Sequence, residues 1–127
     1  MKEEILEVVK KYQEVVHSQD KTLFDEIFAD QADCELISIT TEYKGKEAIY
    51  NDFLVGGIQK AYSVIDLIND GIDINLVNDK MAIVVFKYHT ECIRRENNEA
   101  YGIQGLETQV QIKENGKWKI VHVHYSK

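Results

Sequence analysis

The stretch GKWKIVHVHYS at residues 116–126 decides the fold more firmly than any other part of the chain. Its apolar residues alternate with polar ones after the turn-prone pair Asn115-Gly116, which predicts a final β-strand entered through a tight hairpin. His122 and His124 are two residues apart, so on an unbroken strand they point to the same face. The stretch therefore poses two questions: what the strand packs against, and whether the two imidazoles do chemistry.

The rest of the chain reads as helices followed by strands. Apolar residues recur at three- and four-residue spacing over 3–17, which predicts an amphipathic helix. Asp20 suits the N-cap of a short second helix. The remaining predicted elements are a strand at 34–40, a helix at 46–54 ended by Gly56-Gly57, and strands at 62–78, 81–94, 99–114 and 117–125. The first of these four strands is predicted to break near Asn69-Asp70-Gly71. This order predicts an α+β fold, with helices on one face of an antiparallel sheet.

Length and composition describe an ordinary globular domain. The chain has 127 residues, 44% hydrophobic and 29% charged, which suits a single domain over residues 1–127. Its net charge of −7 disfavours nucleic acid and anionic membranes as partners, because both are negative themselves. Cys34 and Cys92 lack metal-binding or redox spacing, and no secretory signal or membrane span is recognisable. We expect a cytoplasmic protein with reduced thiols and no cofactor.

Three motifs stand in a familiar order along the chain. They are Phe28-Ala29-Asp30, then Tyr43-Lys44-Gly45, then Glu107-Thr108-Gln109-Val110 followed by residues 115–126. This order resembles the SnoaL-like, nuclear-transport-factor-2-like superfamily, which includes ketosteroid isomerase. The tail is most similar to the association (hub) domain of calcium/calmodulin-dependent protein kinase II. The resemblance implies a cone, in which a strongly curved antiparallel sheet wraps a long N-terminal helix, with two shorter helices and a pocket at the open end.

The resemblance to ketosteroid isomerase makes a definite chemical demand. That mechanism needs a carboxylate base and two donors to the developing oxyanion, a tyrosine and a protonated acid. Tyr12 stands where the resemblance places the tyrosine, but the base position falls on Leu36 and the late-strand acid position on Thr108. Neighbouring Glu35 and Glu107 would serve only if the strand register shifted by one. We therefore do not expect the steroid-isomerase mechanism.

The two histidines allow three interpretations: a subunit interface, a metal site or a catalytic base. An unbroken strand would place them on one face with Trp118 and Ile120. The related hub domain uses its outer sheet face for subunit contacts, so we predict an interface formed by Trp118, Ile120, His122 and His124. No spacing supplies the third ligand that a shared metal would need, and no metal is predicted.

The pocket residues are predicted from strand alternation, in which residues two positions apart share a face, and from the resemblance to the hub domain. Three cavity arginines of the hub domain fall on Lys87, Gln109 and Tyr125 here, so this chain keeps one positive charge of three. The loss argues against a strong carboxylate pocket, because a guanidinium binds a carboxylate through two parallel hydrogen bonds. The full set of pocket candidates is Tyr12, Lys87, His89, Glu91, Glu107, Gln109 and Tyr125.

These observations lead to two expected functions. The first is a small-ligand-binding or oligomerisation module without a demonstrated reaction, whose partner is itself in a homodimer or larger ring formed through the sheet. The alternative is an isomerase, dehydratase or cyclase acting on a small organic substrate by acid–base chemistry. Its polar set would be Tyr12, Lys87, His89 and Glu107.

Overall fold

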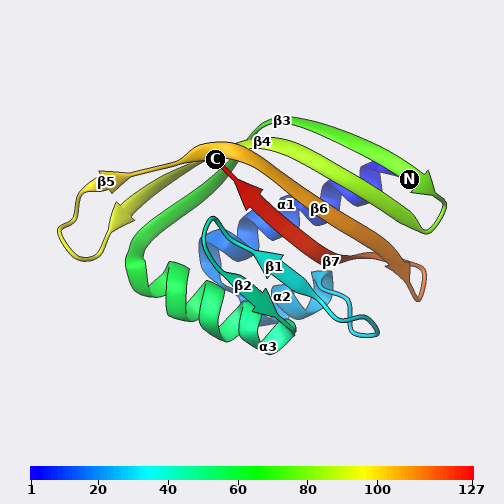
Figure 1. The fold of residues 1–127 in the computed structure, drawn as a ribbon, viewed down its shortest axis with the longest axis horizontal. Helices are drawn as coiled ribbons and strands as arrows, with labels where there is room; N and C mark the ends of the chain where they lie inside the picture. Colours follow the sequence, from blue (N-terminus) through cyan, green and yellow to red (C-terminus); the bar gives the residue numbers. More distant parts are fainter.

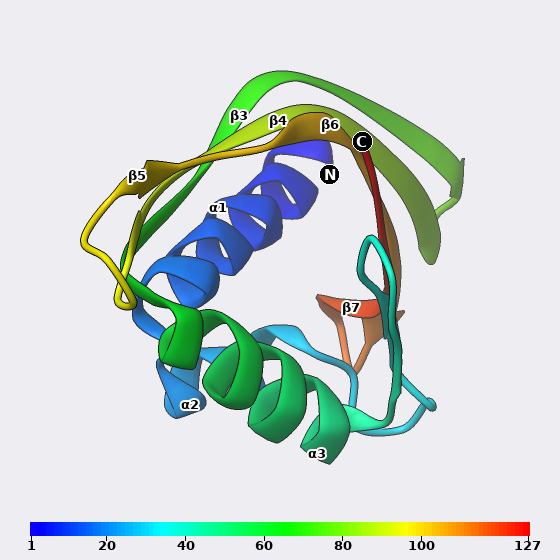
Figure 2. The same cartoon turned by 60° about the vertical axis from the view of Figure 1, so that its left-hand side comes forward.

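A long helix, α1 (Lys2–Ser18), lies in the hollow of a strongly curved sheet (Figures 1 and 2). The computed structural model describes residues 1–127. The other helical segments are α2 (Lys21–Ile27) and α3 (Lys46–Ala48), which continues as a π-helix over Ile49–Gln59. The strands are β1 (Glu35–Ile37), β2 (Glu42–Lys44), β3 (Tyr62–Asn78), β4 (Met81–Arg94), β5 (Ala100–Tyr101), β6 (Gln104–Glu114) and β7 (Lys117–Ser126). The predicted α+β class is confirmed.

The strand order is β2-β1-β7-β6-β4-β3, with β5 paired to the end of β4. All pairs are antiparallel except β1 with β7, which run parallel. Strand β3 passes over α1 and carries register shifts that leave Ser63, Asp70 and Val77 unpaired. Such bulges bend a strand and increase its twist, so the break predicted near residue 70 is a bulge within one continuous strand.

The core forms between α1 and the concave side of the sheet. Ile5, Val9, Tyr12 and Val15 recur along one stripe of α1 and are 0% exposed. The second helix begins as predicted, because the Asp20 side chain accepts a hydrogen bond from the Leu23 N–H at 3.0 Å. None of the helices has both the length and the apolar character needed to cross a membrane.

Two predicted boundaries were wrong for a shared reason, which is close approach of backbone to glycine. Gly56-Gly57 does not end the third helix, which continues to Gln59. A Cβ on Gly56 would lie 2.9 Å from the Asn51 carbonyl oxygen, so glycine fits the wide π-helical turn. The strand predicted at 99–114 is interrupted at Gly102, where a Cβ would lie 2.3 Å from the Thr90 oxygen.

A bulge in β7 changes which side chains enter the core. Gln111 pairs with Ile120 and Val110 pairs with His122, so Val121 is an extra residue on β7. Trp118 and Ile120 therefore face the core before the bulge, at 4% and 0% exposure, and Val123 and Tyr125 face it afterwards. His122 and His124 point outward. The prediction that Trp118 and Ile120 share the outer face with the histidines is wrong.

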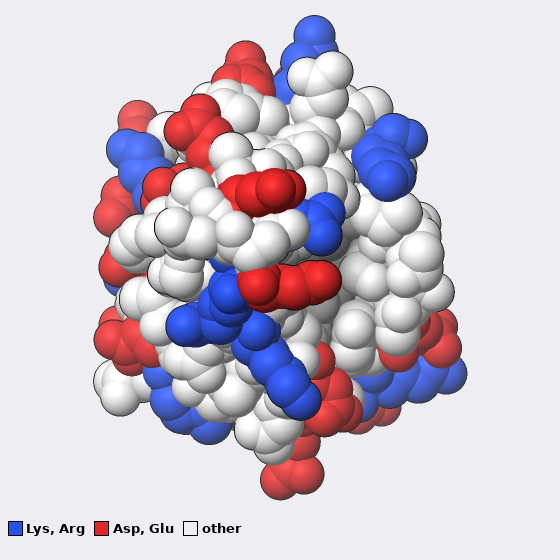
Figure 3. All heavy atoms as spheres, turned by 90° about the vertical axis from the view of Figure 1, so that its left-hand side faces the viewer, with Lys and Arg blue, Asp and Glu red and all other residues white.

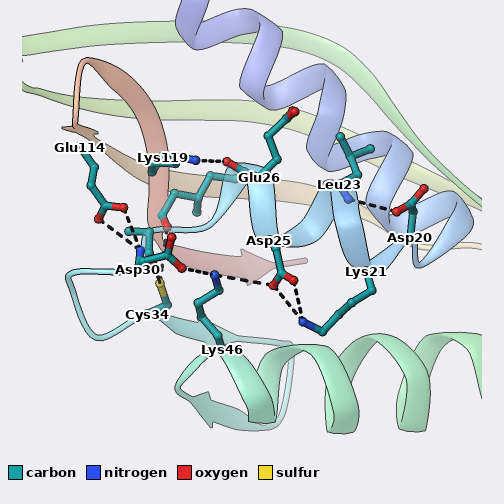
Figure 4. Close-up of polar contacts among 12 residues, drawn as sticks. Asp20, Lys21, Leu23, Asp25, Glu26, Asp30, Cys34, Lys46, Glu114 and Lys119 are labelled. Carbon is teal, nitrogen blue, oxygen red and sulfur yellow. Dashed lines mark hydrogen bonds and ion pairs between the residues drawn. The ribbon is translucent and has the colours of Figure 1, made fainter.

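A set of polar contacts fixes the segment between α2 and β1 (Figure 4). The buried Glu114 carboxylate accepts the backbone N–H groups of Asp30 and Gln31, each at 3.0 Å. The Lys46 ammonium lies 2.7 Å from the Asp30 carboxylate and 3.7 Å from that of Asp25. The end of the β6–β7 hairpin, α2 and α3 are thereby held together.

The bulge gives a prediction that opposes the alternation expected from sequence. Ile120→Ala should lower the free energy of unfolding by about 2–5 kcal/mol, because it opens a void in the core. His124→Ala, on the outer face, should change it by less than about 0.5 kcal/mol. Urea unfolding followed by circular dichroism measures both values, and comparable losses in the two variants would contradict the assigned faces.

Candidate functional site

A cavity of about 330 Å³ lies between the concave face of the sheet, the end of α1, the π-helix and the β1–β2 turn. Twelve of its sixteen lining residues are hydrophobic, and no aspartate, glutamate or histidine lines it. Its apolar walls include Val16, Phe53, Ile58, Ile65, Leu67 and Ile103. The curvature of β3 and β4 over α1 creates this space, because the end of the sheet that carries β5 extends beyond the helix.

The four lining residues that are not hydrophobic are Ser38, Thr40, Thr90 and Lys127, and tyrosines add further polar groups. The rings of Tyr88 and Tyr125 meet edge to face, with centroids 5.4 Å apart. The Tyr88 hydroxyl donates to the Ser126 carbonyl oxygen at 3.0 Å, and burial raises the pKa of Tyr88 to about 12. Both phenols are therefore neutral at physiological pH and act as hydrogen-bonding groups.

Behind Tyr125 lies a further tyrosine, Tyr12 of α1. The hydroxyls of Tyr12 and Tyr125 are hydrogen-bonded to each other, and Tyr12 is 0% exposed. Burial raises the pKa of each phenol well above its ordinary value. The contact fixes the position of the Tyr125 hydroxyl, so the Tyr125 side chain is already oriented at the cavity wall before a ligand binds.

A row of buried polar side chains on β6 continues inward from Tyr125. Glu107 is paired with Tyr125 across the strands and is 0% exposed. Its Oε2 accepts from Gln109 Nε2 at 2.8 Å, and Gln109 Oε1 accepts from Gln111 Nε2 at 3.1 Å. Glu107 Oε1 has no hydrogen-bond partner. Burial raises the pKa of Glu107 to about 8, so this carboxyl group is mainly protonated at neutral pH.

The predicted pocket residues separate into two groups. Tyr12, Glu107, Gln109 and Tyr125 lie inside the molecule, and of these Tyr125 lines the cavity. The other three predicted residues, Lys87, His89 and Glu91, lie on β4 and are considered next.

The prediction that Lys87, His89 and Glu91 face the pocket is wrong. Lys87 is exposed, and the His89 ring lies between the carboxylates of Asp70 and Glu91, at 2.5 and 2.9 Å, on the outer face. The inward residues of β4 are the even-numbered ones from Ala82 to Tyr88. Matching Lys87 to an inward arginine displaced this strand by one residue, which exchanges its two faces.

Sequence reasoning missed two members of the interior polar set, Tyr88 and Gln111. Both were detectable by alternation. Tyr88 continues the inward series Ala82, Val84 and Phe86 of β4, and Gln111 continues that of Glu107 and Gln109. The signal was obscured because β4 is apolar on both faces, so hydrophobicity alone does not separate inward from outward positions.

Of the two acidic positions that the isomerase mechanism requires, one is as the sequence predicted and the other is not. Leu36 is 0% exposed in the core, which leaves no carboxylate at the base position, and Glu35 points outward to His122 at 3.3 Å. On the late strand, however, the inward acid is Glu107, and Thr108 pairs with His124 on the outer face. No group of three potential ligands is arranged to hold a metal ion.

The buried carboxyl group predicts a pH dependence. The folded protein keeps Glu107 protonated up to about pH 8, whereas the unfolded chain ionises near the ordinary pKa of 4.5. The stability that the folded protein gains from a protonated Glu107 is fully present below pH 4.5 and is lost as the pH rises toward about 8. Glu107→Gln carries no proton to lose, so its stability relative to wild type should increase from about pH 5 to about pH 8, by a few kcal/mol. Urea unfolding across this range measures it, and a constant difference would contradict the buried, neutral acid.

Comparison with known proteins places this geometry in a family. The sequence matches the calcium/calmodulin dependent protein kinase II association domain over residues 1–127. A nuclear transport factor 2-like superfamily protein of Salmonella enterica is 30% identical, with a TM-score of 0.92, over 98% of this chain and 89% of that one. No match is found among curated proteins.

Two more distant structures share the fold. The hexachlorocyclohexane dehydrochlorinase LinA-type3 of Novosphingobium barchaimii is 15% identical, with a TM-score of 0.84, over 97% of this chain and 83% of that one. A putative calcium/calmodulin dependent protein kinase II association domain of Xanthomonas campestris is 19% identical, with a TM-score of 0.78, over 95% and 83%. By its match over the whole sequence, the chain belongs to the calcium/calmodulin dependent protein kinase II association domain family.

Proposed function

We propose that this protein is a self-associating module that binds a small, mainly apolar molecule in its cone. The observation that carries the proposal is the cavity of about 330 Å³, with apolar walls and the phenols of Tyr88 and Tyr125. Concave, largely apolar spaces with a few oriented polar groups are the usual form of small-molecule sites. A ligand oxygen, such as a carbonyl or hydroxyl, would meet the phenols while its carbon skeleton fills the cavity.

The energetics favour such a ligand. Apolar surface removed from water contributes roughly 25 cal/mol per Å². The Tyr125 hydroxyl is held by Tyr12, so little conformational freedom is lost when a ligand accepts its hydrogen bond. A strongly polar ligand would instead lose hydration against residues such as Ile65 and Leu67.

Binding is better supported than acid–base catalysis. A general base must come within hydrogen-bonding distance of the proton it removes. The cavity lining contains no aspartate, glutamate or histidine, and Lys127 is its one charged residue. The thiol of Cys92 lines it, but burial raises the pKa of that thiol. An isomerase- or dehydratase-type reaction would have to act through Tyr125, with the protonated Glu107 behind it.

Filling the cavity with a larger side chain should weaken ligand binding. Ile103→Trp places an indole in the cavity, so we expect it to bind octanol, a simple apolar probe with one hydroxyl, at least about tenfold more weakly than wild type. Val77→Trp is the matched control, because Val77 is 48% exposed at the far end of β3. Isothermal titration calorimetry compares the three proteins. Equal affinities for octanol, or no binding by wild type, would overturn the cavity proposal.

Self-association is the second half of the proposal, and it is supported by the family and by the outer sheet face. Val110 pairs with Ile83 on one side and His122 on the other, and the next row joins Val85, Thr108 and His124. These outward side chains form one surface across β4, β6 and β7. We call it the outer patch; its apolar and imidazole groups would lose little hydration on burial against a second copy.

A charge in the outer patch should disrupt association. Val110→Glu would bury a carboxylate between copies, so we expect a shift toward monomer mass in multi-angle light scattering. Val77→Glu, outside the patch, should leave the mass of the wild-type assembly unchanged. If Val110→Glu remains folded by circular dichroism and has the wild-type mass, the outer patch is not the interface.

A further inference from the structure

Three cations gather at the rim of the cone, although the chain has a net charge of −7. They are Lys60, Arg94 and Arg95, and none of them forms an ion pair with a carboxylate. Figure 3 shows Lys and Arg side chains gathered near the centre of this end of the molecule.

The fold brings these cations together from two separate segments. Lys60 follows the π-helix, and the two arginines end β4 and begin the next turn. The Arg95 backbone N–H donates to the Ala61 carbonyl oxygen at 3.0 Å, and its side-chain Nε donates to that of Gln59 at 2.7 Å. The two segments are thus joined, and the cations line a common groove with Tyr62 and Glu96.

The groove adjoins the apolar cavity at one shared residue, Tyr62. Tyr62 lines both, and its ring stacks on that of Tyr101, with centroids 6.1 Å apart and planes inclined by 12°. The Arg94 guanidinium lies over the Tyr101 ring, 4.1 Å from its centroid. A stacked aromatic pair therefore connects the apolar interior to the cations, and the cation–π contact holds one guanidinium at the boundary.

We propose that this groove binds the anionic head group, a carboxylate or a phosphate, of an amphipathic ligand whose apolar body occupies the cavity. This inference rests on the proposed function and specifies its ligand class. A guanidinium offers paired donors to either anion, and a lysine adds a mobile point charge. The hydrophobic walls of the cavity suit the apolar body and the rim cations suit the anionic head group, so together they favour a molecule with two unlike ends. Lys127, which also lines the cavity, is a further cation near such a head group.

Glu96 opposes this binding and provides a second test. Its carboxylate lines the same groove without pairing with any of the three cations. It lowers the positive potential that an anion would meet. Removing its charge by Glu96→Gln should therefore strengthen anion binding, whereas removing the charges of Lys60 and Arg95 should weaken it.

The experiment compares octanoate, octyl phosphate and octanol, which share an apolar body, by isothermal titration calorimetry at low and high salt. We expect wild type to bind at least one anion about tenfold or more tightly than octanol at low salt. The double variant Lys60→Gln with Arg95→Gln keeps Arg94, so it should bind that anion at least about fivefold more weakly than wild type and keep its affinity for octanol. Lys2, Lys10 and Lys80, exposed and distant from the groove, give a matched triple Gln control that should behave as wild type.

The outcomes separate the two proposals. If octanol does not bind to wild type, the cavity proposal fails and this inference fails with it. If octanol binds but neither anion binds more tightly, or if the triple control weakens anion binding as much as the double variant does, only the anion site is overturned. Glu96→Gln covers the case in which the double variant unfolds, because its expected effect is a gain. An unchanged anion affinity in Glu96→Gln would then overturn the site.

Discussion

Burial of the apolar stripe of α1 inside the curved sheet is the interaction on which the rest of the structure depends. Ile5, Val9, Tyr12 and Val15 are completely buried by it, and each such side chain contributes about 1.5–3 kcal/mol relative to exposure. To cover the helix, β3 and β4 must bend, and bulges at Ser63, Asp70 and Val77 allow β3 to do so. The same curvature carries the sheet past the end of α1, which is where the cavity forms.

The interior produced in this way is not uniformly apolar. Glu107, Gln109 and Gln111 are 0% exposed on adjacent inward positions of β6, and Glu107 Oε1 and Gln111 Oε1 have no partners. Unpaired buried acceptors cost about 1–3 kcal/mol each, and an ionised carboxylate would cost more. The raised pKa of Glu107 is the response that limits this cost, because the neutral acid needs less solvation.

The two faces of the sheet and its rim support different roles in our proposals. The inner face supplies the cavity, the outer patch is the proposed surface of self-association, and the basic groove at the rim is the proposed anion site. The bulge at Val121 decides which residues of β7 belong to the inner face. Residues seven positions apart on a regular strand point to opposite faces, but the bulge places both Trp118 and Tyr125 on the inner face. One extra residue thus changes which surface is available to a second copy of the chain.

The sequence by itself determined the long elements and their order, but not β2 or the break between β5 and β6. Three- and four-residue spacing located α1, the Asp20 cap located α2, and β-branched runs with turn residues located the long strands, because these signals are local. The tail motif also led to the correct superfamily and to the α+β cone.

Only the tertiary structure decided which side chains face inward. Strand alternation is a relative signal: its phase depends on pairing with a neighbouring strand, and one extra or displaced residue reverses every assignment beyond it. For this reason Ile120 proved to be core rather than surface, and Lys87, His89 and Glu91 proved to be outside the cavity. The union of Lys60 with Arg94 and Arg95 likewise required the π-helix and β4 to meet, which no local pattern in the sequence encodes.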